Sequence, residues 1–146
     1  MLQQTSCHSS EMSSLQYHND EGYGEACGPL FHYSQSVTIG NIVKVSGQGG
    51  WTFDGSLNLD GDDIKGQVDR AFENVEKVLR AAGLRGWEDV FSVRSYHADL
   101  DATLQMTVDN FKARMPNHKP VWTCIGVKKL AFPGMAIEIE VEAYKA

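Results

Sequence analysis

In the segment 136–144, near the end of the chain, two kinds of residue alternate from residue 137 onward. One set is apolar and the other is mainly acidic: Ile137, Ile139, Val141 and Ala143 alternate with Glu138, Glu140, Glu142 and Tyr144. Successive side chains of a β-strand point to opposite faces of a sheet. The pattern therefore predicts a strand whose apolar side meets a core and whose acidic side faces away from it. Such a strand requires neighbouring strands and a layer that covers one face of the sheet.

Apolar periodicity predicts where those neighbours and that layer lie. We expect further strands at 31–37, 41–47, 89–99 and 121–130, and helices at about 62–82 and 102–115. In the strand at 89–99 we place Phe91 and Val93 on one face. Asp62 or Asp63 is the expected N-cap of the first helix, and Gly83 follows its end.

Each predicted helix has an apolar stripe that should face the sheet. The first carries Ile64, Val68, Phe72, Val75, Val78 and Leu79, and the second carries Leu104, Val108, Phe111 and Met115. The resulting order is ββαβαββ, which predicts an α+β fold with one mixed sheet and both helices on one face. We expect residues 28–146 to form this single domain. Residues 1–27 are rich in polar residues and glycine, and predict a flexible or loosely docked N-terminal arm.

Charge and composition argue against several classes of function. The formal net charge is −6 and Lys128–Lys129 is the one basic doublet, so we expect no nucleic-acid partner. No apolar run approaches the length of a membrane helix, so we expect no membrane partner. Three widely spaced cysteines and no signal-like N-terminus favour the cytoplasm. The histidines show no metal-ligand spacing, so no metal is expected.

A few residues are candidates for chemistry, each with a structural alternative. Glu138 can be an acid in a cleft or an exposed strand residue, and these alternatives are about even. Glycines 47–50 can supply backbone N–H groups for an anion, or allow a close backbone approach at a strand end. His97 and Asp99 can pair as base and partner, but a surface pair is more common. Cys124 lies in an apolar strand, where a buried, inert thiol is the usual case.

An ordered set of short matches resembles the RidA/YjgF family over roughly residues 28–145. The matching segments are Tyr33–Ser36, Ser46–Gln48, Gln67 with Asn74, Ala81–Leu84, Asp99–Leu100 and Ile137–Glu140. This resemblance implies a chorismate-mutase-like fold assembled as a homotrimer with ligand clefts between subunits. It also implies cofactor-independent hydrolysis of reactive imines and enamines to keto compounds and ammonia.

The resemblance implies roles for particular residues. Glu138 corresponds to the glutamate that places or activates water. The implied ligand-binding residues are Tyr33, Ser46, Gly47, Trp122, Thr123 and Cys124. Family members that hydrolyse imino acids carry an Arg that binds the substrate carboxylate, and Trp122 stands at that position. Val108 stands near the position of a cleft asparagine.

These departures give the cleft a more aromatic and apolar lining, which suits a less charged substrate. Two other functions remain open at this stage. One is a non-catalytic trimer that binds a metabolite or a protein. The other, rated lower because the chain is acidic, is a ribonuclease or translation inhibitor.

Overall fold

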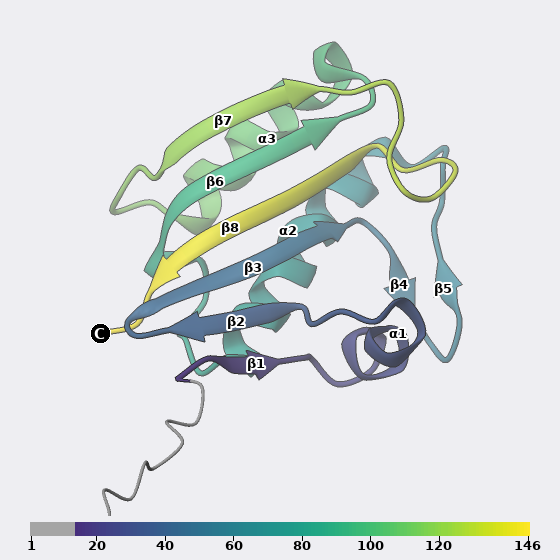
Figure 1. The fold of residues 1–146 in the computed structure, drawn as a ribbon. Helices are drawn as coiled ribbons and strands as arrows, with labels where there is room; N and C mark the ends of the chain where they lie inside the picture. Colours follow the sequence, from purple (N-terminus) through teal and green to yellow (C-terminus); the bar gives the residue numbers. More distant parts are fainter. Residues whose placement is uncertain (1–13) are drawn as a thin grey trace, which may run out of the picture.

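The computed structural model describes residues 14–146, which form one mixed sheet backed by helices (Figure 1). In this part of the chain six strands pair in the order β1-β2-β3-β8-β6-β7. They are β1 (Gln16–His18), β2 (Ser36–Ile39), β3 (Ile42–Gly49), β8 (Ile137–Tyr144), β6 (Val90–His97) and β7 (Val121–Gly126). Only β6 and β7 of these strands pair in parallel.

The helices α2 (Ile64–Ala81) and α3 (Leu100–Arg114) lie on the same face of the sheet. The ββαβαββ order and the α+β class predicted from the sequence are confirmed. The structure adds α1 (Tyr23–Phe31), the hairpin strands β4 (Thr52–Phe53) and β5 (Leu57–Asn58), and the 3-10 turn η1 (Trp87–Asp89). No helix within residues 14–146 has the length and apolar composition to cross a membrane.

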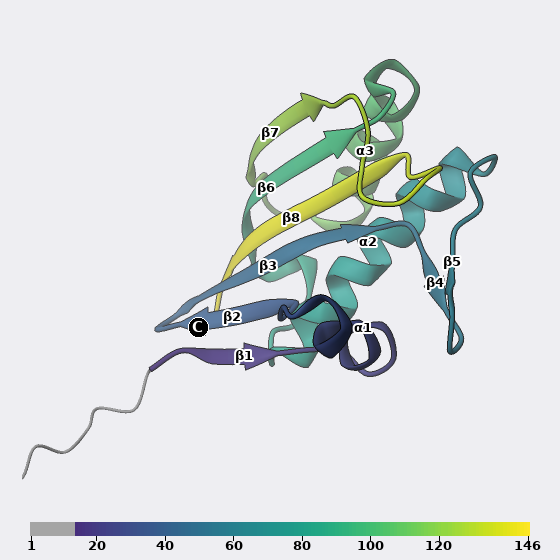
Figure 2. The same cartoon turned by 45° about the vertical axis from the view of Figure 1, so that its right-hand side comes forward.

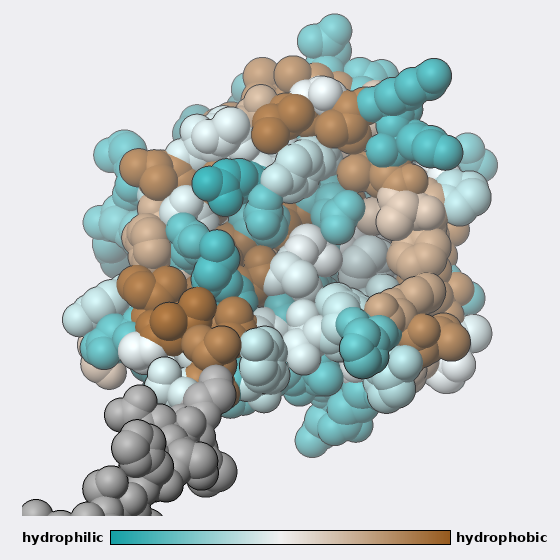
Figure 3. All heavy atoms as spheres, in the orientation of Figure 1, coloured by the Kyte–Doolittle hydropathy of each residue, from teal (hydrophilic) through white to brown (hydrophobic). Residues whose placement is uncertain are grey.

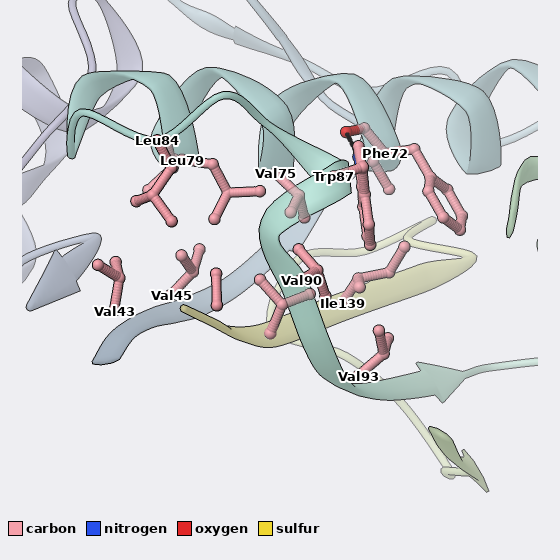
Figure 4. Close-up of a cluster of buried hydrophobic side chains, with 14 of the residues drawn as sticks. Val43, Val45, Phe72, Val75, Leu79, Leu84, Trp87, Val90, Val93 and Ile139 are labelled. Atoms are coloured by element: carbon pink, nitrogen blue, oxygen red, sulfur yellow. Dashed lines mark hydrogen bonds between the residues drawn. The ribbon is translucent and has the colours of Figure 1, made fainter. Parts of the chain in front are cut away.

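The core lies between α2 and the sheet (Figure 4). Phe72, Val75 and Leu79 of α2 are fully buried and face Val43 and Ile139 of the central strands. Burying a side chain of this size stabilises the fold by about 1.5–3 kcal/mol. Of the two caps considered, Asp63 is the one used, since its Oδ1 accepts the Gly66 N–H at 2.9 Å.

The buried face of α3 differs from the predicted stripe. Its buried residues are Thr103, Thr107 and Asn110, whereas Leu104 is exposed. The threonines can be buried because their hydroxyls donate to helix carbonyls: Thr103 to Asp99 O at 2.7 Å and Thr107 to Thr103 O at 2.9 Å. The helix is therefore turned so that the threonines share its buried face with Phe111 and Met115, which pack against the core as predicted. Val108, Phe111 and Met115 also line a groove beside β7.

The N-terminal prediction was also wrong for the residues that the structure describes. Residues 1–13 lie outside them, but residues 14–27 are not a loose arm, because β1 pairs with β2 and Cys27 of α1 is buried. The first predicted strand begins at Ser36 and not at residue 31, because α1 runs to Phe31 and His32 ends it in the left-handed conformation.

Two other strands differ in detail. A register shift between Val90 and Ser92 of β6 buries Val90 and Val93 but leaves Phe91 partly exposed, so Phe91 and Val93 do not share the core face. The strand β7 ends at Gly126, four residues before the predicted end.

Within residues 14–146, no helix covers the middle of the second face of the sheet. Figure 3 shows hydrophilic side chains across its middle, with hydrophobic ones near the β2–β3 turn and along the β7 edge. Lys44 pairs with Glu142 at 3.1 Å, and the Tyr96 hydroxyl donates to Glu140. Glu138 lies on this face, at the end of the sheet where α1 and the β4–β5 hairpin also lie (Figure 2).

Candidate active site

Glu138 lies against a bulge in the neighbouring strand. The β3–β8 register shifts between Val45 and Gln48, so Ser46 and Gly47 are left out of the regular pairing. A Cβ at Gly47 would lie 2.1 Å from Glu138 Oε1. Only glycine therefore leaves room for the carboxyl group in its observed position, over the bulged backbone.

Aromatic side chains extend from this point. The Tyr23 ring stacks on Trp51 at a centroid distance of 4.6 Å, and Trp51 meets Phe132 edge to face at 6.2 Å. Phe132 lies 6.2 Å from the ring of Phe31. The Tyr23 hydroxyl is hydrogen-bonded to Tyr33. These rings, which we call the aromatic wall, make a continuous surface from α1 to the loop before β8.

The carboxyl group and the aromatic wall line one open cavity of about 450 Å³. Its lining residues are Tyr23, Phe31, Tyr33, Ser46, Gly47, Trp51, Ala131, Phe132 and Glu138. Four of the sequence-predicted site residues, Tyr33, Ser46, Gly47 and Glu138, thus lie together. The size is that of a small-molecule site.

Burial changes the acidity of Glu138 and Tyr33, two of the polar residues that line the cavity. Desolvation, and to a lesser extent the charge of Glu140, raise the pKa of Glu138. Burial also raises the pKa of Tyr33, although its hydrogen bond with Tyr23 opposes that shift. A carboxyl group whose pKa moves toward neutrality can both donate and accept a proton during a reaction.

Amide side chains of α2 hold the loops of the cavity in place. Asn74 Nδ2 donates to Gly49 O at 2.8 Å and to Trp51 O at 2.9 Å. Gln67 Nε2 donates to Gly134 O at 2.9 Å, while its Oε1 accepts the Ala136 N–H at 2.8 Å. These bonds fix the backbone beside Trp51 and at the start of β8.

Polar side chains also anchor α1, which supplies Tyr23 and Phe31. The Gln35 Oε1 accepts the Asp20 N–H at 2.7 Å, and Asp20 Oδ1 accepts the Gly24 N–H at 2.8 Å. Gln35 Nε2 donates to Gln48 Oε1 at 3.3 Å. The helix is thus tied to the same strand that carries the bulge.

The three predicted site residues of β7 do not reach this cavity within one chain. Trp122 lies on the helix side of the sheet, where its ring meets Phe111 edge to face at 4.9 Å. Its Nε1 donates to Ser95 Oγ at 2.8 Å. Cys124 is aligned with Ser95, on the side that Trp122 occupies, and the exposed Thr123 points to the other face.

His97 has a structural environment rather than a catalytic one. It is buried, and its Nδ1 and Nε2 lie 2.7 Å from Thr103 Oγ1 and Ser95 Oγ. Asp99 instead caps α3 by accepting the Ala102 N–H at 3.1 Å. The hypothesis that His97 and Asp99 pair as base and partner is therefore wrong.

The glycines after Gly47 serve close packing. A Cβ at Gly50 would lie 2.1 Å from Gln67 O, and one at Gly49 would lie 2.5 Å from the Trp51 ring. This favours close backbone approach over an anion site. In the described residues no three His, Cys, Asp or Glu side chains are grouped so as to hold a metal ion.

Several cavity residues were not identified from the sequence. Tyr23 and Phe31 belong to the segment expected to be a loose arm or the first strand, and Trp51 and Phe132 lie in loops. Trp51 directly follows the glycines at 49 and 50. A large aromatic residue beside these glycines was the one sequence feature that could have indicated a cavity wall there.

The chain belongs to the class of small α+β proteins in which two helices cover one face of a sheet and leave the other face open. In this chain a carboxyl group lies over a strand bulge on the open face. The family model described as Endoribonuclease L-PSP matches residues 24–145. The chain is therefore a member of that family, which includes the RidA/YjgF proteins.

Individual relatives agree with this assignment. The RutC family protein YjgH of Escherichia coli is 37% identical over 113 residues, which cover 76% of this chain and 81% of that protein. A 2-iminobutanoate/2-iminopropanoate deaminase of Salmonella typhimurium is 30% identical over 120 residues, covering 81% and 87%. The solved structure of the Escherichia coli YjgF gene product has a TM-score of 0.74 at 26% identity, covering 90% of this chain and 99% of its own.

Proposed function

We propose that this protein is a cofactor-independent hydrolase of imines or enamines, with Glu138 as its general acid and base. The observation that carries the proposal is the placement of a partly buried carboxyl group over Gly47, in a cavity of small-molecule size. The deaminase named among the relatives supports the same reaction class.

The reaction needs one group that can accept and return a proton. Water adds to the carbon of a protonated imine while Glu138 takes a proton from that water, which gives a neutral carbinolamine. Glu138 then returns the proton to nitrogen and the C–N bond breaks. As the hydroxyl oxygen forms the new carbonyl, Glu138 takes its proton and passes it to the departing ammonia. The balance is iminium plus water to carbonyl compound plus ammonium. Tyr33 and the backbone at Gly47 orient the ligand.

We also propose a homotrimer in which each cavity is completed by the β7 edge of a neighbouring copy. This edge strand carries Trp122 and Cys124 on one face and Thr123 on the other. None of the three lines the cavity of its own chain. A groove of about 530 Å³ beside β7, lined by residues such as Phe111, Met115 and Trp122, is suited to contact with another subunit. The helix-free face of the sheet offers a further contact surface.

RNA cleavage is the other activity that the family description suggests. The cavity lining, which belongs entirely to residues 14–146, has no Lys or Arg to hold a phosphate group. The chain also carries a net charge of −6. Imine hydrolysis is therefore the function that the geometry supports better.

The test measures carbonyl and ammonia release from imines made in situ by an amino-acid oxidase or an amine oxidase. Glu138→Gln should lower the enzymatic rate at least about 100-fold, the usual contribution of general acid–base catalysis. Glu142→Gln is the matched control, because it changes the same residue type on the same face of β8, next to Lys44. Equal rates for Glu138→Gln and the wild type would contradict the proposal. Ligand binding without turnover would identify a binding protein instead.

A further inference from the structure

The cavity beside Glu138 combines aromatic rings with one carboxyl group. Its lining, all within residues 14–146, includes no Lys or Arg. Besides Glu138, its ionisable side chains are two tyrosines, which ionise only near pH 10 in the unperturbed state. Near neutral pH a ligand in this cavity therefore meets aromatic faces and an acid, and no positive charge.

The rings of the aromatic wall are held in fixed orientations. Tyr23 and Trp51 are buried, with 7% and 5% of their surface exposed, and they stack on one another. The edge-to-face contact between Trp51 and Phe132 has an interplanar angle of 87°. The backbone beside Trp51 is fixed by Asn74. The ring faces more open to a ligand are those of Phe31, which is 52% exposed, and Phe132, which is half-buried; Phe132 is held against both Trp51 and Phe31.

We propose that this cavity selects ligands with a positively charged nitrogen and no carboxylate, such as an iminium or a substituted ammonium group. Aromatic faces attract cations through the negative potential above the ring, and they do so most strongly where water is excluded. Glu138 supplies the opposite charge. The inference rests on the proposed function, because it names the substrate class of the same cavity.

A ligand that carries a carboxylate meets the reverse situation. Its charge would lie near Glu138 in a partly desolvated cavity, where like charges repel more strongly than in water. The groove beside β7, which the proposed trimer brings near the cavity, carries Trp122 together with Lys112 and Lys119. A carboxylate probe therefore also tests whether these two lysines reach the ligand.

Three small probes separate charge from shape. They are choline, its uncharged isostere 3,3-dimethylbutan-1-ol, and the carboxylate 2-oxobutanoate, each titrated into the full-length protein at pH 7.5. The indole N–H signal of Trp51 in NMR spectra reports binding. The signal of Trp87, which is buried and donates to Phe72 O at 2.9 Å, is the internal control. We expect choline to bind at least about tenfold more tightly than its isostere, and 2-oxobutanoate to bind more weakly than choline.

Variants test the two parts of the site. Glu138→Gln should weaken choline binding about tenfold and leave the affinity for the uncharged isostere unchanged. Phe132→Leu should weaken choline binding while Trp51 still reports it. Phe91→Leu is the control, because that ring is partly exposed and lies outside the cavity.

The outcomes separate this inference from the proposed function. Equal affinity for choline and the isostere, or tighter binding of 2-oxobutanoate, would overturn the inference. If imino acids are then hydrolysed in a Glu138-dependent manner, the proposed function stands alone. If choline binds as expected but no imine is hydrolysed, the ligand class stands and the catalytic proposal fails.

Discussion

Glu138 and Gly47 form the smallest unit on which the proposed activity depends. The side chain of Glu138 occupies the space that a Cβ at Gly47 would need, and its carboxyl group is partly removed from water. Removing a carboxyl group from water costs stability when it is ionised. The same burial raises the pKa of Glu138, which suits it to proton transfer. The burial of Glu138 therefore favours activity but lowers the stability of the fold.

Gly47→Ala should remove activity while leaving the fold intact. The added methyl group would displace the Glu138 carboxyl group, and a shift of about 1 Å in a reacting group can lower the rate about 100-fold. Steady-state kinetics and thermal unfolding should be measured together. Gly61→Ala is the control, because its added Cβ would meet its nearest neighbour, Gly134 Cα, at 3.6 Å, which is an ordinary contact distance. An active Gly47→Ala variant would show that Glu138 need not occupy its observed position.

Glu138→Gln should stabilise the protein at neutral pH. Folding raises the pKa of Glu138, so its contribution to stability is complete below the unfolded value of 4.5 and is lost as the pH rises through the folded value. Glutamine does not ionise, so the variant does not lose stability as the pH rises. The melting temperature of the variant should exceed that of the wild type at pH 7.5, and the difference should shrink toward pH 4. A constant difference would contradict the pKa shift.

At the scale of elements, buried polar side chains orient the helices. The chain of contacts from Trp122 through Ser95, His97 and Thr103 links β7, β6 and α3. Because the Thr103 hydroxyl donates to Asp99 O, His97 Nδ1 donates to Thr103 and Nε2 accepts from Ser95. Only neutral His97 satisfies every group in this chain.

Acid should therefore weaken the packing of α3. Burial lowers the pKa of His97, so the unfolded state binds a proton that the folded state does not. Stability should fall as the pH drops below about 6.5, the unfolded value. Urea unfolding of His97→Gln should show lower stability at pH 7.5, by about 1–3 kcal/mol, and a smaller change between pH 7.5 and 5.5. The exposed His32, changed to Asn, is the control. An unaltered pH dependence in His97→Gln would exclude this role.

At the scale of the whole molecule, a single chain leaves large surfaces without a protein partner. In residues 14–146 the middle of one sheet face has no helix over it, and β7 is an edge strand with Val121 68% exposed. Apolar surface of this kind marks an interaction site. The homotrimer proposed above would cover the β7 edge and close the cavity.

Light scattering should give the mass of three chains at micromolar concentration. Val121→Lys should shift the protein toward monomers and lower its activity, because a charge at the β7 edge opposes burial. Glu73→Lys, on the exposed side of α2, should change neither property. A wild-type monomer with full activity would refute the shared cleft.

The main elements of the fold follow from local patterns in the sequence. The two-residue alternation of β8 fits only a strand, and the 3.6-residue spacing of the apolar stripe in α2 fits only a helix. The structure contains both elements. Asp63 and Gly83 mark the ends of α2 through short-range geometry. Tyr33, Ser46, Gly47 and Glu138 were named from the sequence, and they share one cavity.

The sequence by itself thus determined the order of elements and part of the cavity, because periodicity, capping and short motifs depend on neighbouring residues. Tertiary structure decided the remainder. The rotation of α3 depends on a hydrogen bond to His97 in another element, and α1 is held by contacts with Gln35. The aromatic wall joins residues as distant as Tyr23 and Phe132, and Trp122 packs on Phe111, outside the cavity of its own chain. Such contacts depend on how distant segments pack together, which no local pattern specifies.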